Sequence, residues 1–88
     1  MTQAELKALR EQLGLSQSQF AQLMGVHPMT VSKWERGAAF PSPYQEGFFS
    51  QFQLAAKKPN VQDDLKNILI VAGVIAAMYF LLQAASKK

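Results

Sequence analysis

Apolar residues recur at helical spacing from the first residues of the chain. Three leucines follow one another at intervals of three and four residues, at Leu6, Leu9 and Leu13. This spacing places them on one face of a helix. Thr2 with Glu5 three residues later matches a capping box, in which side chains and backbone amides satisfy each other at a helix start. The pattern therefore predicts a first helix that begins after Thr2 and ends before Gly14, since glycine enters the left-handed C-terminal position at little cost.

Two further helices are predicted between Ser16 and Gly37. Ser16 with Gln19 repeats the capping signal, and Gly25 is expected to end the second helix. Pro28 suits the first position of the third helix, where its missing N–H costs nothing. The positions expected to face inward are Phe20, Ala21, Leu23 and Met24 in the second helix, and Val26, Val31 and Trp34 in and before the third.

The second half of the chain predicts a fourth helix and a long apolar segment. The fourth helix is expected over residues 43–57, and Asn60 could cap a fifth helix. Residues 68–82 then form a run of fifteen positions without a charged or strongly polar group, which Ala84 and Ala85 extend. Because the run is too long for a strand and does not alternate, it predicts one long hydrophobic helix.

Such a helix must be buried on every side, in lipid or in protein. Residues 68–85 would span about 27 Å, slightly less than a ~30 Å hydrocarbon core, and Lys66 with Lys87 and Lys88 could reach the interfaces on either side. Gly73 with Ala77 would let two such helices approach closely. The pattern slightly favours a membrane anchor over a soluble dimerisation or tetramerisation helix, and both alternatives stay open.

Composition narrows the functional classes. The formal net charge is +3, which permits a phosphate partner without demanding one. The chain has no cysteine and a single histidine, His27, so it offers neither thiolate ligands nor a cluster of metal-binding side chains. No serine has a base and an oxyanion site beside it in the sequence pattern. We therefore expect no metal, no cofactor and no enzymatic activity.

The tight turn between the second and third helices carries the functional prediction. Gly25, Val26 and His27 leave too few residues for the two helices to lie antiparallel, so the third helix should stand away from the domain. A helix in that position fits the roughly 12 Å wide major groove of DNA, where its outward side chains meet base edges.

The stretch LREQLGLSQSQFAQLMGVHPMTVSKWERG resembles the Cro and lambda-repressor-like (Xre-type) helix-turn-helix family. The residues that carry the resemblance are Leu15, Ser16, Gln17, Ala21, Gly25, Val26, Thr30, Val31, Ser32, Trp34, Glu35 and Gly37. The similarity extends over about residues 4–57. It implies an all-α, lambda-repressor-like domain that binds double-stranded DNA.

The resemblance also implies roles for individual residues. In this family a glutamine at the start of the second helix contacts phosphate, which here is Gln17, and the residue before the closing glycine meets the backbone, which is Arg36. The positions that match base-reading residues are His27, Pro28, Met29, Thr30, Ser32 and Lys33. His27, Pro28 and Met29 are not the amides or arginines that give bidentate base contacts, so readout would depend on Thr30, Ser32 and Lys33, with Met29 against a thymine methyl.

Arg10 and Glu35 match an ion pair of the same fold that links the first helix to the third. Removing one partner of such a pair is costly, although its net contribution to stability is variable. We interpret the pair as a structural one that fixes the recognition helix without touching DNA.

Together these inferences predict an all-α chain with a helix-turn-helix DNA-binding domain at residues 1–58 and a hydrophobic C-terminal helix at residues 59–88. The expected function is sequence-specific transcriptional regulation, as a repressor that occupies a two-fold operator as a homodimer or higher homo-oligomer. The DNA-binding domain would be cytoplasmic, and the tail would anchor it to the inner membrane or pair its copies. The alternative is a membrane-tethered or oligomeric protein-interaction module that no longer reads DNA.

Overall fold

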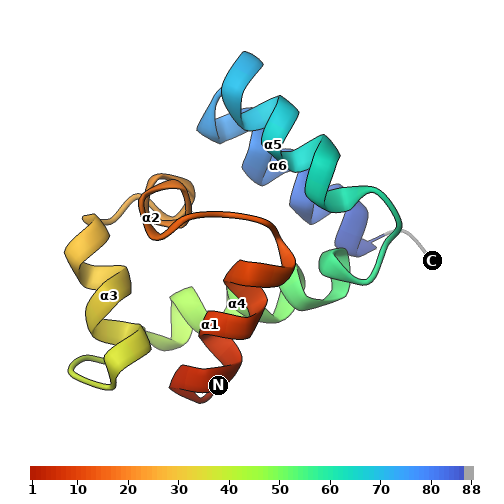
Figure 1. Cartoon of the computed structure of the whole chain (residues 1–88). Helices are drawn as coiled ribbons and strands as arrows, with labels where there is room; N and C mark the ends of the chain where they lie inside the picture. The colour runs from red at the N-terminus through yellow and green to blue at the C-terminus, as the bar shows by residue number, and fades with distance from the viewer. Residues whose placement is uncertain (87–88) are drawn as a thin grey trace.

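The computed structural model describes residues 1–86, and these form six α-helices and no β-strand (Figure 1). Their bounds are α1 Gln3–Gln12, α2 Gln17–Met24, α3 Pro28–Arg36, α4 Pro43–Ala56, α5 Val61–Val71 and α6 Val74–Ser86. Lys87 and Lys88, which we expected to flank an apolar span, lie outside the described residues. The all-α expectation is confirmed for the described part of the chain.

Local capping signals set where the first helices begin. At α1 the Thr2 hydroxyl accepts from the Glu5 amide at 3.1 Å, and the Glu5 carboxylate accepts from the Thr2 amide at 2.8 Å. The same reciprocal box forms between Ser16 and Gln19 at α2, as the sequence predicts. A third box opens α4 at Ser42, where sequence reasoning had only placed a helix start. Each box satisfies amides that a helix start leaves without an intrahelical acceptor.

One continuous apolar core joins all six helices. Its centre is a group of aromatic rings. The ring centroids of Phe20 in α2 and Phe49 in α4 are 5.7 Å apart, and Trp34 of α3 packs edge to face on Phe49 with ring centroids 5.6 Å apart. Phe52 packs edge to face on Phe20 at 6.4 Å. Phe49 and Phe52 are buried, and Phe48 is only half-buried. Trp34 is a core residue, as expected.

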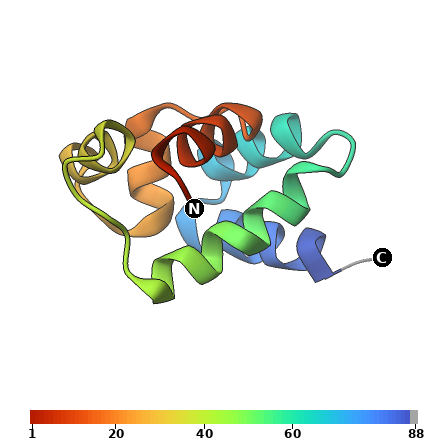
Figure 2. The same ribbon diagram turned by 90° about the horizontal axis from the view of Figure 1, so that it is seen from below.

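The expectation of one long C-terminal helix is wrong, because the apolar segment breaks in two. α5 ends at Val71, and Gly73 takes a positive φ of 95° before α6 begins at Val74. Left-handed backbone is open to glycine at little cost, so Gly73 reverses the chain where a side chain would resist it. The result is a helical hairpin, α5–α6, in which α6 packs mainly on α4 and α5 (Figures 1 and 2).

The hairpin is covered in part by the rest of the same chain, whereas the sequence predicted a membrane anchor or an oligomerisation helix. Leu65 of α5 and Ala77 and Leu81 of α6 are completely buried, in the same core as α1–α4. Among residues 1–86, no helix is long and apolar enough to cross a membrane.

The expected cap of the fifth helix also differs. Asn60 is the residue before α5, but its side chain makes no capping hydrogen bond and its backbone is left-handed, with φ 65°. A capping asparagine needs extended backbone to turn its side chain toward the next amides. Asn60 instead serves the turn that follows α4, a conformation that asparagine tolerates better than most residues.

One face of the hairpin remains uncovered. It carries four exposed apolar side chains, Ile70 and Val71 of α5 and Ile75 and Tyr79 of α6, which we call the outer hairpin face. Ile75 is 88% exposed and Tyr79 is 65% exposed. In Figure 1 the α5–α6 hairpin lies at the upper right of the molecule and α3 at the left.

Candidate nucleic-acid interface

The turn between α2 and α3 directs α3 away from the body of the protein. Gly25 takes φ 69° at the end of α2, and α3 begins only three residues later at Pro28. Val31 and Trp34 anchor one side of α3 in the core. α3 consequently lies at the edge of the fold, with its other side facing outward (Figures 1 and 2).

The structure brings most of the predicted contact residues together on this outward side. His27, Pro28, Met29, Lys33 and Arg36 are exposed, and Thr30 and Ser32 are half-buried. Met29, Lys33 and Arg36 are spaced four and three residues apart, so they form one stripe along the helix. The stripe combines an apolar side chain that is 53% exposed with two cations.

His27 has a role that sequence reasoning missed. Its Nδ1 accepts a hydrogen bond from the Met29 backbone amide at 3.0 Å, so the ring is the N-terminal cap of α3. Histidine is outside the group of residues that usually cap helices, which explains the omission. The signal that could have found it is the following proline, because Pro28 at the first helical position makes its predecessor the capping residue.

Arg36 is partly committed to its own helix. Its Nε lies 3.3 Å from the Ser32 carbonyl oxygen and 3.2 Å from the Ser32 hydroxyl, and it donates to both. The guanidinium has four other N–H groups, which leaves donors for an acceptor outside the protein. The bond to Ser32 therefore positions the Arg36 head group at the C-terminal end of the stripe.

Gln17 lies differently from the phosphate contact that the family resemblance implies. Its side-chain Nε2 donates to Glu35 Oε1 at 3.1 Å, and the residue is half-buried. Gln17 is also the first residue of α2, where a backbone N–H has no intrahelical acceptor. Gln17 therefore keeps two donors suited to a phosphate, its backbone amide and the second N–H of Nε2.

Arg10 joins three segments around α3. Its Nε donates to Glu35 Oε2 at 2.6 Å and its second terminal nitrogen to Glu35 Oε1 at 3.1 Å. The first terminal nitrogen donates to the Leu15 carbonyl oxygen at 2.8 Å, so the same guanidinium holds the linker between α1 and α2. A two-pronged arginine–carboxylate pair fixes direction as well as distance. The orientation of α3 is thereby tied to α1 and to the start of α2.

Electrostatics of the pair favour its charged form. The hydrogen bond to Glu35 raises the pKa of Arg10 above its ordinary value. Burial acts to raise the pKa of Glu35, but hydrogen bonds from Arg10 and Gln17 outweigh it, so the pKa of the carboxyl lies below its ordinary value. The Glu35 side chain is only 5% exposed. The one carboxylate on α3 is consequently neutralised and covered, and it adds little repulsion toward a polyanion.

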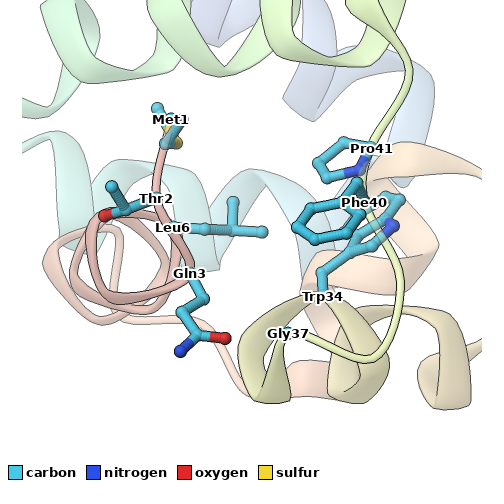
Figure 3. Close-up of a pocket in the computed structure, with 8 residues that line it drawn as sticks. All are labelled: Met1, Thr2, Gln3, Leu6, Trp34, Gly37, Phe40 and Pro41. Atoms are coloured by element: carbon cyan, nitrogen blue, oxygen red, sulfur yellow. The ribbon is translucent and has the colours of Figure 1, made fainter.

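A pocket of about 360 Å³ lies between the start of α1 and the loop after α3 (Figure 3). Its lining residues are Met1, Thr2, Gln3, Leu6, Trp34, Gly37, Phe40 and Pro41. Phe40 and Pro41 approach from the α3–α4 loop, facing Leu6 and Met1 across the space (Figure 3). None of its side chains is an acid or a base, so the pocket holds no pair for acid–base catalysis.

Comparison with known proteins identifies the segment that contains this interface. Residues 6–43 match the family model described as helix-turn-helix, a span from α1 to the first residue of α4. No curated protein and no solved structure shows a significant match to the chain. Residues 6–43 are thus similar to the Cro/C1-type (Xre-like) helix-turn-helix, a segment found in DNA-binding transcription regulators.

Proposed function

We propose that the protein is a sequence-specific transcriptional repressor that occupies its operator as a homodimer. The observation that carries the proposal is the outward side of α3, where Met29, Lys33 and Arg36 are exposed on a helix held rigidly from behind. Direct readout of DNA requires such a helix to enter the major groove with its contact groups already oriented. Occupancy of a promoter by this helix would block polymerase without further chemistry.

The distribution of charge supports contact with a polyanion. Lys33 and Arg36 are exposed on the outward side of α3, whereas Glu35 is paired with Arg10. Backbone amides at the start of α2, including that of Gln17, add uncharged donors for phosphate. His27, Pro28, Thr30 and Ser32 complete the proposed contact set around these groups.

Pairing of two copies through the outer hairpin face would suit this function. The face consists of Ile70, Val71, Ile75 and Tyr79, and residues 67–86 contain no charged side chain that would repel a second copy. Two copies would read two half-sites about 34 Å apart, one turn of the double helix. Because the outer hairpin face contains residues of α5 and α6 only, α3 itself would form no part of this pairing surface.

The test is binding-site selection with the full chain on a pool of random duplexes, followed by charge reversal. Lys33→Glu should lower affinity for the selected duplex at least about tenfold, because it replaces a donor in the groove with a repelled carboxylate. Lys66→Glu makes the same change of charge on α5 and should leave affinity nearly unchanged. Failure of selection to enrich any sequence, or equal effects of the two reversals, would contradict the proposal.

The second candidate function is a protein-interaction module that no longer reads DNA. The observation that favours it is the outer hairpin face itself, since large exposed apolar groups mark surfaces that bind proteins. This function predicts no enriched duplex, and binding to a protein partner that Ile75→Glu abolishes. The selection experiment therefore separates the two functions directly.

A further inference from the structure

His27 uses one nitrogen of its ring inside the protein and presents the other to the outside. Nδ1 accepts from the Met29 amide at 3.0 Å, so in this bonded state Nδ1 carries no proton. A neutral imidazole has one protonated and one unprotonated nitrogen, which places the proton on Nε2. The helix cap therefore selects one tautomer of His27.

The selected tautomer leaves a hydrogen-bond donor at the tip of α3. His27 is exposed, and within residues 1–86 no group accepts a hydrogen bond from Nε2. Nδ1 and Nε2 point in divergent directions from the ring, so a ring whose Nδ1 faces the α3 backbone directs Nε2–H away from it. The donor is fixed in place by the cap and needs no reorganisation to bind.

We infer that His27 Nε2–H donates to a hydrogen-bond acceptor of the bound duplex, and that His27 discriminates against donors at that place. The inference rests on the proposed function and adds the chemistry of its site. Two neighbours agree with it: Lys33 offers donors and no acceptor, and Met29 is apolar. The N-terminal half of the stripe thus suits acceptors and methyl groups of the duplex.

Two kinds of acceptor in a duplex fit a single fixed donor. One is a phosphate oxygen, and the other is an acceptor on a base edge in the major groove, which can be purine N7, guanine O6 or thymine O4. The exocyclic amino groups of adenine and cytosine are donors and would face Nε2–H without a hydrogen bond. If the partner is a base, the structure therefore predicts a purine or thymine, and not cytosine, opposite His27. If it is a phosphate, His27 fixes register without reading sequence.

The protein side of the test separates the cap from the donor. In His27→Asn the side-chain oxygen can replace Nδ1 as the cap, but no atom reaches the position of Nε2. His27→Asn should retain the wild-type melting temperature and bind the selected duplex about three- to tenfold more weakly, the range of one hydrogen bond. His27→Ala loses both functions and should also melt lower. Wild-type affinity in His27→Asn would overturn the inference.

The DNA side of the test identifies the acceptor. Duplexes that carry single analogues in the selected site each remove one candidate acceptor: 7-deazapurines remove N7, 2-aminopurine in place of guanine removes O6, 5-methyl-2-pyrimidinone in place of thymine removes O4, and uncharged methylphosphonates remove an anionic phosphate oxygen. One substitution should weaken binding by the wild-type protein several-fold and leave binding by His27→Asn unaffected, and its identity names the acceptor as a particular base atom or a phosphate. Equal sensitivity of both proteins at every position would overturn the inference while leaving the proposed function intact. Failure to select any duplex would overturn the proposed function and, with it, this inference.

The tautomer has a direct spectroscopic readout in the free protein. Two-bond proton–nitrogen correlation spectra distinguish a protonated from an unprotonated imidazole nitrogen. We expect the proton on Nε2 in the wild-type full chain. A proton on Nδ1 would show that the cap is absent, and it would overturn the inference independently of any DNA measurement.

Discussion

The helix-turn-helix and the C-terminal hairpin are both two-helix units on one core, yet they are held by different forces. α3 is oriented by a polar network in which Arg10, Glu35 and Gln17 connect three segments. Leu65, Ala77 and Leu81 attach the α5–α6 hairpin to the rest of the protein through apolar contacts in the shared core. Hydrogen bonds and ion pairs in a polar network fix the orientation of a helix, whereas apolar contacts are non-directional and mainly keep the helix close to the core.

The exposed surfaces of the two units also differ, one being charged and polar and the other apolar. α3 presents cations and a donor at its tip, which suits a charged and geometrically exacting partner. The hairpin presents Ile70, Ile75 and Tyr79, which suit another apolar surface. α3, whose proposed partner requires a precise orientation, is therefore the helix that hydrogen bonds and an ion pair hold in place. Four predictions test this division, from the largest expected effect to the smallest.

Breaking the polar network should cost the most. Arg10→Met removes the partner of a covered carboxylate and should lower the free energy of unfolding by about 3 kcal/mol. The double variant Arg10→Met with Glu35→Leu removes both charges and should recover most of the loss. Urea denaturation of the three proteins measures both effects. A loss below about 1 kcal/mol in Arg10→Met would show that the network does not hold α3.

Placing a charge on the outer hairpin face should separate the copies without unfolding them. Ile75→Glu alters an exposed position, so the free energy of unfolding of the monomer should change by less than about 0.5 kcal/mol. Sedimentation should report a monomer, and affinity for a two-fold operator should fall about tenfold or more, because the second domain is no longer tethered. Gln12→Glu adds the same charge on exposed α1 as the control. A dimer that persists in Ile75→Glu would refute pairing at this face.

The hairpin turn should depend on glycine at one position. Gly73→Ala forces a side chain into left-handed backbone and should destabilise the fold by about 1 kcal/mol. Gly47 lies inside α4 with open space around it, so Gly47→Ala should stabilise the protein by roughly 0.5–1 kcal/mol. Thermal denaturation of both variants gives the comparison. If both substitutions raised, or both lowered, the melting temperature, the role assigned to Gly73 in the turn would be contradicted.

Acid should weaken the helix-turn-helix through Glu35. Its pKa is lowered in the folded state, so its stabilising contribution is present above the ordinary value of 4.5 and is lost as the pH falls below it. Arg10 stays protonated throughout this range and does not shift the window. Unfolding free energy should therefore drop more between pH 7 and pH 3 in the wild type than in the Arg10→Met, Glu35→Leu double variant. If the unfolding free energies of the two proteins fell equally with pH, Glu35 would be excluded as the source of the acid sensitivity.

Sequence reasoning worked where the signal was local. The boxes at Thr2 and Ser16, the stop at Gly25 and the proline start at Pro28 involve residues within a few positions of one another, and the structure has them as predicted. The position of Arg10 opposite Glu35 came from a family resemblance, because a contact across 25 residues leaves no local trace.

Sequence reasoning failed where tertiary contacts decided. The apolar run looked like one helix because composition does not reveal which side of α6 lies on α4, and Gly73 inside an apolar segment was interpreted as a packing residue. His27 was interpreted only as a contact residue, since its cap depends on a ring orientation that no pattern encodes. The capping role of His27 therefore became visible only in the structure, where its hydrogen bond with the Met29 amide is present.

The repeated capping boxes have a consequence for how the chain folds. α1, α2 and α4 each begin with a hydroxyl side chain and a Glu or Gln three residues later. Helix starts are thus chosen by interactions that close very small loops, which form far faster than contacts between distant segments. Nascent helices can therefore be present before the aromatic centre assembles, and the rate-limiting encounter is the docking of preformed pieces, a route typical of rapidly folding helical domains.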